Sequence, residues 1–154
     1  MPVDQIQALM EALGPVSDDI AAIARNGEAA WAVAYDEDTI VAFDLVEDQG
    51  KLVLSIDLGQ PAPVNRFAVY ETMLSYNLLW PETGGVKMGL GGAGGGLVQM
   101  FELNTTGLDV ERLQTVLEGF VAKALMWRRF VADGPQDGEA PFPMLRPEEQ
   151  MIRV

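Results

Sequence analysis

Large apolar residues recur at helical spacing in three stretches of the chain and alternate with small or polar residues in several others. Residues 2–14 carry them three and four positions apart, which predicts a short amphipathic helix that Gly14 and Pro15 stop. Residues 18–26 are expected to form a turn or to prolong this helical region. Residues 110–133 predict a long last helix, with Asp109 as its N-cap and Gly134 just beyond its end.

Alternation with a period of two predicts the strands. It runs through residues 28–35, 39–46 and 52–58, and polar turns separate these three segments. Residues 86–90 and 97–103 are expected to form a second hairpin around a glycine-rich tip. The predicted fold class is therefore α+β, in the order α-β-β-β-α-β-β-α, with an antiparallel twisted sheet and helices packed on it. Residues 1–133 are expected to form one domain, and residues 134–154, rich in Pro and Glu, a flexible C-terminal tail.

The predicted helix over residues 65–80 is apolar on two sides, and Pro81 ends it. One face carries Phe67, Tyr70, Leu74 and Leu78, and the other carries Val69, Met73, Tyr76 and Trp80. A helix on the surface of a globular protein normally shows one apolar stripe, so two structures must cover this one. We expect the sheet to cover one face and a second copy of the chain to cover the other. The assignment of the two faces stays open. We expect the homodimer interface to centre on this helix and on the strand after its glycine break, with Met73, Tyr76, Asn77 and Trp80 as the candidate residues.

The first helix and the first strands suggest a binding surface. A helix of about three turns is marginal by itself and must gain stability by packing. The first three strands also carry apolar residues on both faces, and only one face can meet the helices. An uncovered apolar patch usually marks an interaction site. The candidate residues for binding an extended partner segment are Ile6, Leu9, Met10, Leu13, Trp31 and Phe43. The alternative is that these side chains are ordinary core.

Composition excludes several classes of protein. The 23 acidic residues against 10 basic ones give a net charge of −13, which would repel nucleic acid and anionic membranes. No apolar run approaches the roughly 18–20 residues that span a bilayer, and no secretory signal is recognisable. The absence of cysteine fits a reducing compartment. We therefore expect a cytoplasmic protein.

Enzymatic chemistry finds little support. The chain has neither His nor Cys, so the usual general base, thiol nucleophile and soft metal ligands are missing. The run from Gly89 to Gly94 has the spacing of a dinucleotide fingerprint, but a strand pattern follows it where that fingerprint needs a helix. Asp36, Glu37 and Asp38 lack the Gly and the distal Glu of a calcium loop. We predict no catalytic residue, no metal site and no cofactor.

The segment from Met73 to Val131 resembles the class I type III secretion chaperones, the Tir chaperone (CesT-like) family. The features that correspond are Leu78-Leu79, the Gly84-Gly85 break, the glycine-tipped hairpin and the last helix entered through an Asp. The likeness extends in outline from residue 3 to residue 131, and the tail departs from it. It implies a homodimer in the bacterial cytosol that binds the N-terminal segment of a secreted effector without ATP or any cofactor.

Two other functions remain as alternatives. One is a small acidic adaptor or structural protein whose second apolar face meets a different protein. The other is a metal-dependent enzyme that uses Asp or Glu, which would need carboxylates clustered in a pocket.

Overall fold

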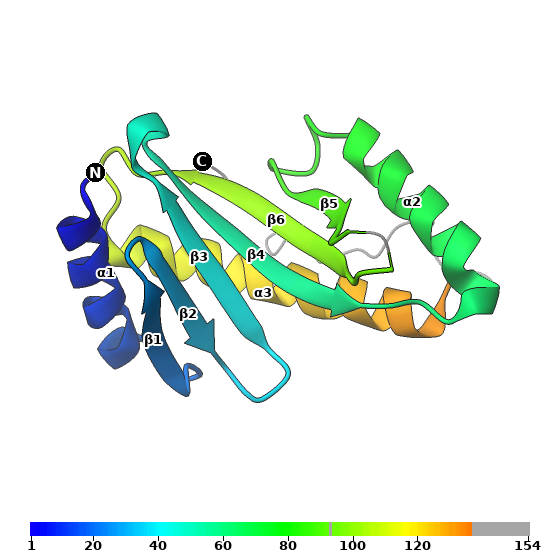
Figure 1. The fold of residues 1–154 in the computed structure, drawn as a ribbon, viewed down its shortest axis with the longest axis horizontal. Coiled ribbons are helices and arrows are strands. Elements are labelled where there is room, and N and C mark those ends of the chain that lie inside the picture. The colour runs from blue at the N-terminus through cyan, green and yellow to red at the C-terminus, as the bar shows by residue number, and fades with distance from the viewer. Residues whose placement is uncertain (93, 137–154) are drawn as a thin grey trace.

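The computed structural model describes residues 1–92 and 94–136. The described chain forms three α-helices and a six-stranded sheet (Figure 1). The helices are α1 (Val3–Val16), α2 (Arg66–Leu78) and α3 (Val110–Asp133). The strands are β1 (Ala22–Gly27), β2 (Ala30–Ala34), β3 (Ile40–Val46), β4 (Lys51–Gly59), β5 (Lys87–Leu90) and β6 (Leu97–Asn104). Short 3-10 helices, η1 (Glu47–Gln49) and η2 (Pro63–Asn65), follow β3 and precede α2.

The strands lie in the order β1-β2-β3-β4-β6-β5, and every neighbouring pair is antiparallel. Strands β1 and β5 therefore form the two edges. Figure 1 shows α3 running along one face of the sheet, α1 beside β1 at one end and α2 beside β5 at the other. The fold consequently offers two surfaces at opposite ends of the sheet, each made by one helix and one edge strand.

The core lies between the sheet and α3. Strict alternation in β4 turns Leu52, Leu54, Ile56 and Leu58 inward, and all four are buried. The register places Leu54 between Phe43 of β3 and Phe101 of β6, which are also buried. Burying one such side chain stabilises the fold by about 1.5–3 kcal/mol. The α+β class with an antiparallel sheet is confirmed.

Helix α3 ties the ends of the domain together. The predicted cap is present, because Asp109 Oδ1 accepts a hydrogen bond from the Arg112 backbone N–H at 2.8 Å. Gln114 Nε2 donates to the Val16 carbonyl at the end of α1 at 2.8 Å. Further along α3, Arg128 donates to the Asp38 carbonyl at 2.9 Å and to Thr39 Oγ1 at 3.1 Å. These contacts hold the end of α1 and the β2–β3 turn against one helix.

The prediction missed one strand. Residues 18–26 were expected to be a turn or helical, whereas Ala22–Gly27 is strand β1, so the order is α-β-β-β-β-α-β-β-α. Strand β1 lies at an edge and its only residue that is not exposed is the half-buried Ile23. Such a strand has no alternation for periodicity to detect.

The ends of two helices also differ from the prediction. Helix α1 continues to Val16, with Pro15 inside its last turn. Asn65 stands at the N-cap of α2, but its side chain does not cap the helix; Asn65 Nδ2 donates instead to the Asp133 carbonyl at 3.4 Å. Helix α2 ends at Leu78, before Trp80.

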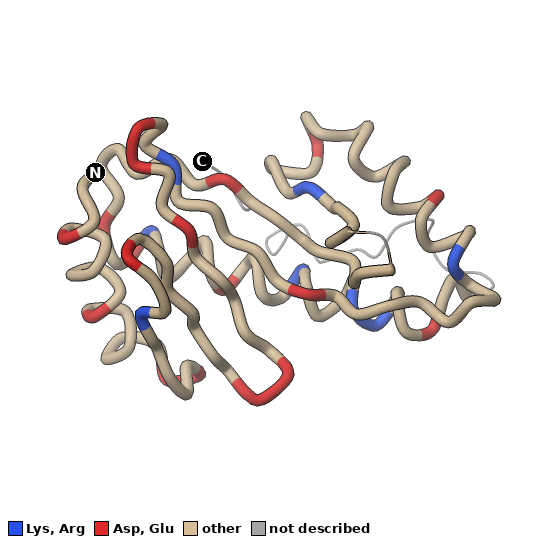
Figure 2. The backbone as a smooth tube through the Cα atoms, viewed as in Figure 1, with Lys and Arg blue, Asp and Glu red and all other residues tan. Residues whose placement is uncertain are grey.

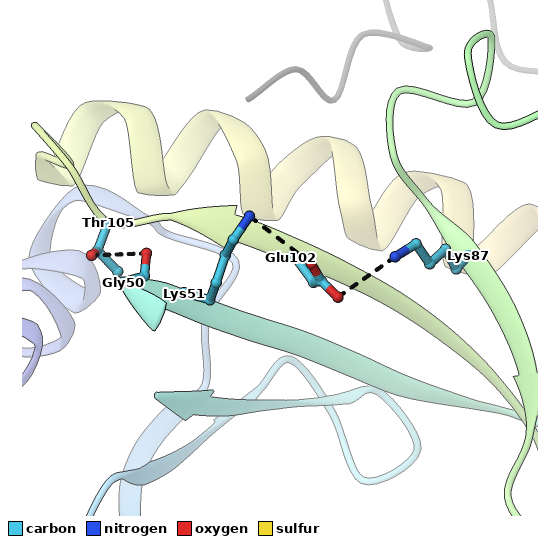
Figure 3. A network of polar contacts seen from close by, with 5 residues as sticks. All are labelled: Gly50, Lys51, Lys87, Glu102 and Thr105. Carbon is cyan, nitrogen blue, oxygen red and sulfur yellow. Dashed lines mark hydrogen bonds and ion pairs between the residues drawn. The ribbon is translucent and has the colours of Figure 1, made fainter. Parts of the chain in front are cut away.

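The sheet face turned away from α3 is polar in places. Glu102 of β6 lies 4.0 Å from Lys51 of β4 and 3.5 Å from Lys87 of β5 (Figure 3). Thr105 Oγ1 donates to the Gly50 carbonyl at 3.1 Å, which fastens the end of β6 to the start of β4. Exposed ion pairs of this kind add little stability. Figure 2 shows that acidic residues are spread over the fold, with several in the β2–β3 and β3–β4 turns.

Two further predictions concern the C-terminal tail and the absence of a membrane-spanning segment. The division into a domain over residues 1–133 and a tail over 134–154 stays a prediction, since residues 137–154 lie outside the described range. Among the described helices, none has both the length and the apolar character that crossing a membrane requires.

Candidate functional site

A groove of about 310 Å³ lies between α1 and β1. Helix α1 contributes Gln7, Met10 and Gly14 to its walls, and the facing side includes Ile20, Ile23 and Trp31. The approach of the two elements is close at Gly14, where a Cβ atom added to the glycine would lie 3.8 Å from Ile23 Cδ1. The groove therefore has an apolar floor and enough room for side chains of another chain.

Trp31 is held in place from two sides. Its indole Nε1–H donates to Gln7 Oε1 at 2.7 Å, which joins β2 to α1. The guanidinium carbon of Arg25 lies 5.8 Å from the centre of the Trp31 ring system, within the range of a cation–π contact. Arg25 also donates to the carbonyls of Gly27 and Glu28. The wall around Trp31 is thus held by contacts within the chain itself.

The open edge of the sheet runs beside this groove. Strand β1 pairs with β2 in regular register from Ala22 to Arg25, and its other side has no neighbouring strand among the described residues. Unpaired backbone groups at such an edge are a template for strand addition. The groove and the edge together suit an extended segment that pairs its backbone with β1 and places side chains against α1.

The six residues predicted to bind a partner are mostly interior. Ile6, Leu13 and Phe43 are fully buried in the core, and Leu9 is half-buried against it. Met10 and Trp31 are also almost fully buried, yet both line the groove. The predicted surface and the groove therefore share α1 and the first strands, while four of the six named side chains do not line the groove. The structure does not test whether they contact a partner.

Sequence reasoning missed the residues that shape the groove from β1 and its approach. Ile20, Ile23 and Arg25 lie in the segment predicted to be a turn or helical. Gln7 carries no signal of its own, because a polar residue in an amphipathic helix normally faces solvent. Its partner, the Trp31 indole, lies 24 positions away and leaves no local trace in the sequence.

A second surface lies at the other end of the sheet. Helix α2 exposes Phe67 by 78%, Leu74 by 70% and Leu78 by 80%, and we call these three residues the α2 patch. Trp80 is exposed nearby by 68%. A groove of about 210 Å³ adjoins the patch, with Tyr70 and Leu74 of α2 on one side and Met88 and Leu90 of β5 on the other. Large apolar side chains gathered at this exposure are typical of interaction surfaces.

The structure assigns the two faces of the central helix. Val69, Met73 and Tyr76 face the core and are buried. Of the residues predicted for the dimer interface, Met73 and Tyr76 thus lie inside the fold, and Asn77 is half-buried and bonds to β5. Only Trp80 is exposed. The exposed face of α2 is the one that carries Phe67, Leu74 and Leu78.

An unusual buried cation supports α2 from below. Lys123 of α3 is 8% exposed, and its Nζ donates to the Tyr76 hydroxyl at 3.4 Å and to the Thr83 carbonyl at 3.5 Å. Burial lowers the pKa of Lys123 from its usual value near 10.5. Burial also raises the pKa of Tyr76 to about 12, and its ring stacks edge-to-face on Trp127 at 4.9 Å. Burial therefore disfavours the charged form of Lys123 in the scaffold under the α2 patch.

Lys123→Met is expected to raise the melting temperature at pH 7 by about 2–4 °C, the effect of roughly 1 kcal/mol in a domain of this size. Because the folded-state pKa is lowered, the unfolded chain holds the proton more tightly. The loss of folding stability caused by burying the charged Lys123 is complete below the folded-state pKa, and it disappears as the pH rises to about 10.5. Thermal unfolding of both proteins from pH 7 to 10.5 should show the difference shrinking. Lys51→Met, at a partly exposed lysine, is the control and should show no such trend.

The sequence features that suggested an enzyme do not form an active site among the described residues. Among the described residues, no group of three or more Asp, Glu, His or Cys side chains is placed to hold a metal ion. Asp36 accepts the Asp38 backbone N–H at 2.9 Å within an exposed turn, and this bond lowers the pKa of Asp36. The glycines after β5 form a hairpin tip closed by the Gly91 N–H and the Gly96 carbonyl at 2.8 Å, and strand β6 follows. The helix start that a dinucleotide fingerprint needs is therefore replaced by a strand.

Comparison with known proteins defines the class. The model of the Tir chaperone protein (CesT) family matches residues 20–128. No curated protein matches the chain. Among solved structures, a chain of the ExsC-ExsE complex superposes with a TM-score of 0.71 at 17% identity, covering 86% of this chain and 98% of that one. A chain of the HopA1-SchA chaperone-effector complex gives 0.60 at 17% identity, covering 83% and 99%. At this identity the structural likeness establishes the fold.

The fold and the family match together define a secretion-chaperone scaffold. This chain belongs to the Tir chaperone (CesT) family, as its sequence pattern indicated. The family consists of chaperones, which confirms the prediction that the chain is not an enzyme. The match begins within the connection before β1 and ends in the last turns of α3, so it includes β1, β2, α2 and β5.

Proposed function

We propose that this chain is a cytoplasmic type III secretion chaperone that binds the N-terminal segment of a secreted effector and keeps it soluble and competent for secretion. The observation that carries the proposal is the α1–β1 groove, which lies beside the open edge of the sheet. Family membership and the likeness to a chaperone-effector complex support it.

The proposed binding mode follows from the physics of an unfolded segment. Its backbone N–H and C=O groups need partners, and the β1 edge supplies them by strand addition. Its apolar side chains need cover, and the floor formed by Met10, Ile23 and Trp31 supplies it. The net charge of −13 keeps the complex soluble while such a segment is held. No step requires a nucleotide or a metal ion.

We also propose that the α2 patch joins two copies of the chain. A symmetric dimer about α2 would bury Phe67, Leu74 and Leu78 of both copies. The patch lies at the opposite end of the sheet from the α1–β1 groove (Figure 1). A dimer would therefore leave the α1–β1 groove of each copy open. An adaptor that meets a different protein through α2 is the competing function.

The proposal is tested by purifying the chain from its native host and identifying what accompanies it. The expected companion is a secreted protein. In limited proteolysis of the complex, the chaperone should protect one short segment near the N-terminus of this companion. Deleting the chaperone should lower both the cellular level and the secretion of that companion. A companion bound as a folded domain, or unaffected secretion after deletion, contradicts the proposal.

A further inference from the structure

The two edges of the sheet differ in how their backbone groups are used. At β5, the Met88 N–H donates to Asn77 Oδ1 at 2.8 Å, and Asn77 Nδ2 donates to the Met88 carbonyl at 2.8 Å. The side chain of one α2 residue thus makes both bonds that a neighbouring strand would make to Met88. Among the described residues, no side chain does this for β1 between Ala22 and Arg25.

The register shows which backbone groups of β5 remain free to pair with another strand. In an antiparallel edge strand, successive residues direct their backbone groups alternately toward the sheet and away from it. Since Met88 bonds to Asn77, Lys87 and Gly89 are the positions that face β6, and the Gly91–Gly96 bond continues that alternation. Strand β5 has four residues, so only Met88 and Leu90 face outward. With Met88 occupied, Leu90 is the single outward position left for an incoming strand.

We propose that Asn77 is a strand-edge cap that excludes other strands from β5 and so confines strand addition to β1. Its amide is suited to this because it presents one donor and one acceptor, as a backbone peptide group does. Proteins protect sheet edges with short strands, charges, bulges or covering elements. Here a short strand and a side-chain amide act together, and the α2 patch remains available for helix packing.

The first test needs only the chain itself. Asn77→Ala removes both bonds to Met88 and is expected to raise the hydrogen-exchange rate of the Met88 amide by roughly tenfold. It should also produce species heavier than those of the parent in sedimentation velocity, growing with protein concentration. Asn104→Ala is the matched control, because Asn104 Oδ1 accepts only a turn N–H from Thr106. It should sediment like the parent.

A label locates the new contact. The chain has no cysteine, so Lys87→Cys carries a single pyrene on β5 and Leu125→Cys carries one on α3. In the Asn77→Ala background, excimer emission should grow with the heavier species for the β5 label and not for the α3 label. Asn77→Leu keeps the branched shape of the side chain without its polar atoms and should behave in the same way if Asn77→Ala does not fold. Folded Asn77 variants with faster Met88 exchange and unchanged sedimentation overturn the proposal.

The second test uses the effector complex and therefore rests on the proposed function. With Asn77 intact, a photo-crosslinker on Ala24→Cys of β1 should capture the bound segment, and one on Lys87→Cys of β5 should not. Capture from Lys87→Cys overturns the role of Asn77. If no effector can be isolated, the proposed function fails, whereas the sedimentation and exchange results decide the edge cap by themselves.

Discussion

Replacing Leu74 and Leu78 together with glutamate is expected to convert a dimer of this chain into a folded monomer. Both side chains are at least 70% exposed, so each change should alter the stability of the isolated fold by no more than about 0.5 kcal/mol. In a dimer about α2, each copy would lose two buried leucines, at about 1.5–3 kcal/mol apiece, and would also bury charge. The dissociation constant should rise by at least about 100-fold, as sedimentation equilibrium would show.

The matched control for this change is Leu125→Glu. Leu125 is 47% exposed on α3, outside the α2 patch, so the variant should remain dimeric. Circular dichroism should give the same spectrum for all three proteins. A parent that is monomeric at micromolar concentration rules out the homodimer. A parent monomer that binds a different protein through Leu74 and Leu78 would instead favour the adaptor.

Gly14→Leu is expected to weaken effector binding while leaving the chaperone as stable as before, or more so. A Cβ atom at this position would meet nothing nearer than Ile23 Cδ1 at 3.8 Å, so the new side chain fits without a clash at its base. Replacing a helical glycine usually stabilises a helix by up to about 1 kcal/mol. The leucine would occupy part of the groove and displace one apolar side chain of the effector, worth about 1.5–3 kcal/mol. Titration calorimetry should show binding weaker by roughly 10–100-fold.

Ala8→Leu is the control for the groove. Ala8 lies in the same helix and is exposed, but it does not line the groove, so the same enlargement should leave affinity unchanged. Equal binding by Gly14→Leu and the parent would place the effector elsewhere. Met10→Glu and Leu13→Glu are poor probes of binding, because both positions are almost fully buried and a charge there should unfold the domain.

The strongly periodic elements were predictable from the sequence. Strand β4 alternates buried Leu and Ile residues with half-buried or exposed ones along its length, and α3 has both its stripe and its Asp109 cap. Strand β1 could not be found in the same way, because five of its six residues are exposed and no alternation marks them. Since β1 forms one wall of the groove, missing it concealed most of the candidate site.

The same limit applies to the apolar residues of α1 and α2. Periodicity shows that Met10 and Leu13 share a face, but a core-facing stripe and a binding stripe have the same spacing. In α2, both faces are apolar, and only the position of Trp127 and Lys123 beneath Tyr76 decides which one is covered. Asn77 gave no signal as a cap because its partner Met88 belongs to a strand 11 positions further on.

Helix α3 has a consequence for how the two surfaces influence each other. Its first half holds the end of α1 through Gln114, and its second half supports α2 through Lys123 and Trp127. At 24 residues it is about 36 Å long and forms an unbroken α-helix from one surface to the other. Coupling between distant sites requires an element with two arrangements that both sites bias. The structure shows α3 as one continuous helix in a single arrangement, and we expect filling the groove to leave the free energy of association at α2 unchanged.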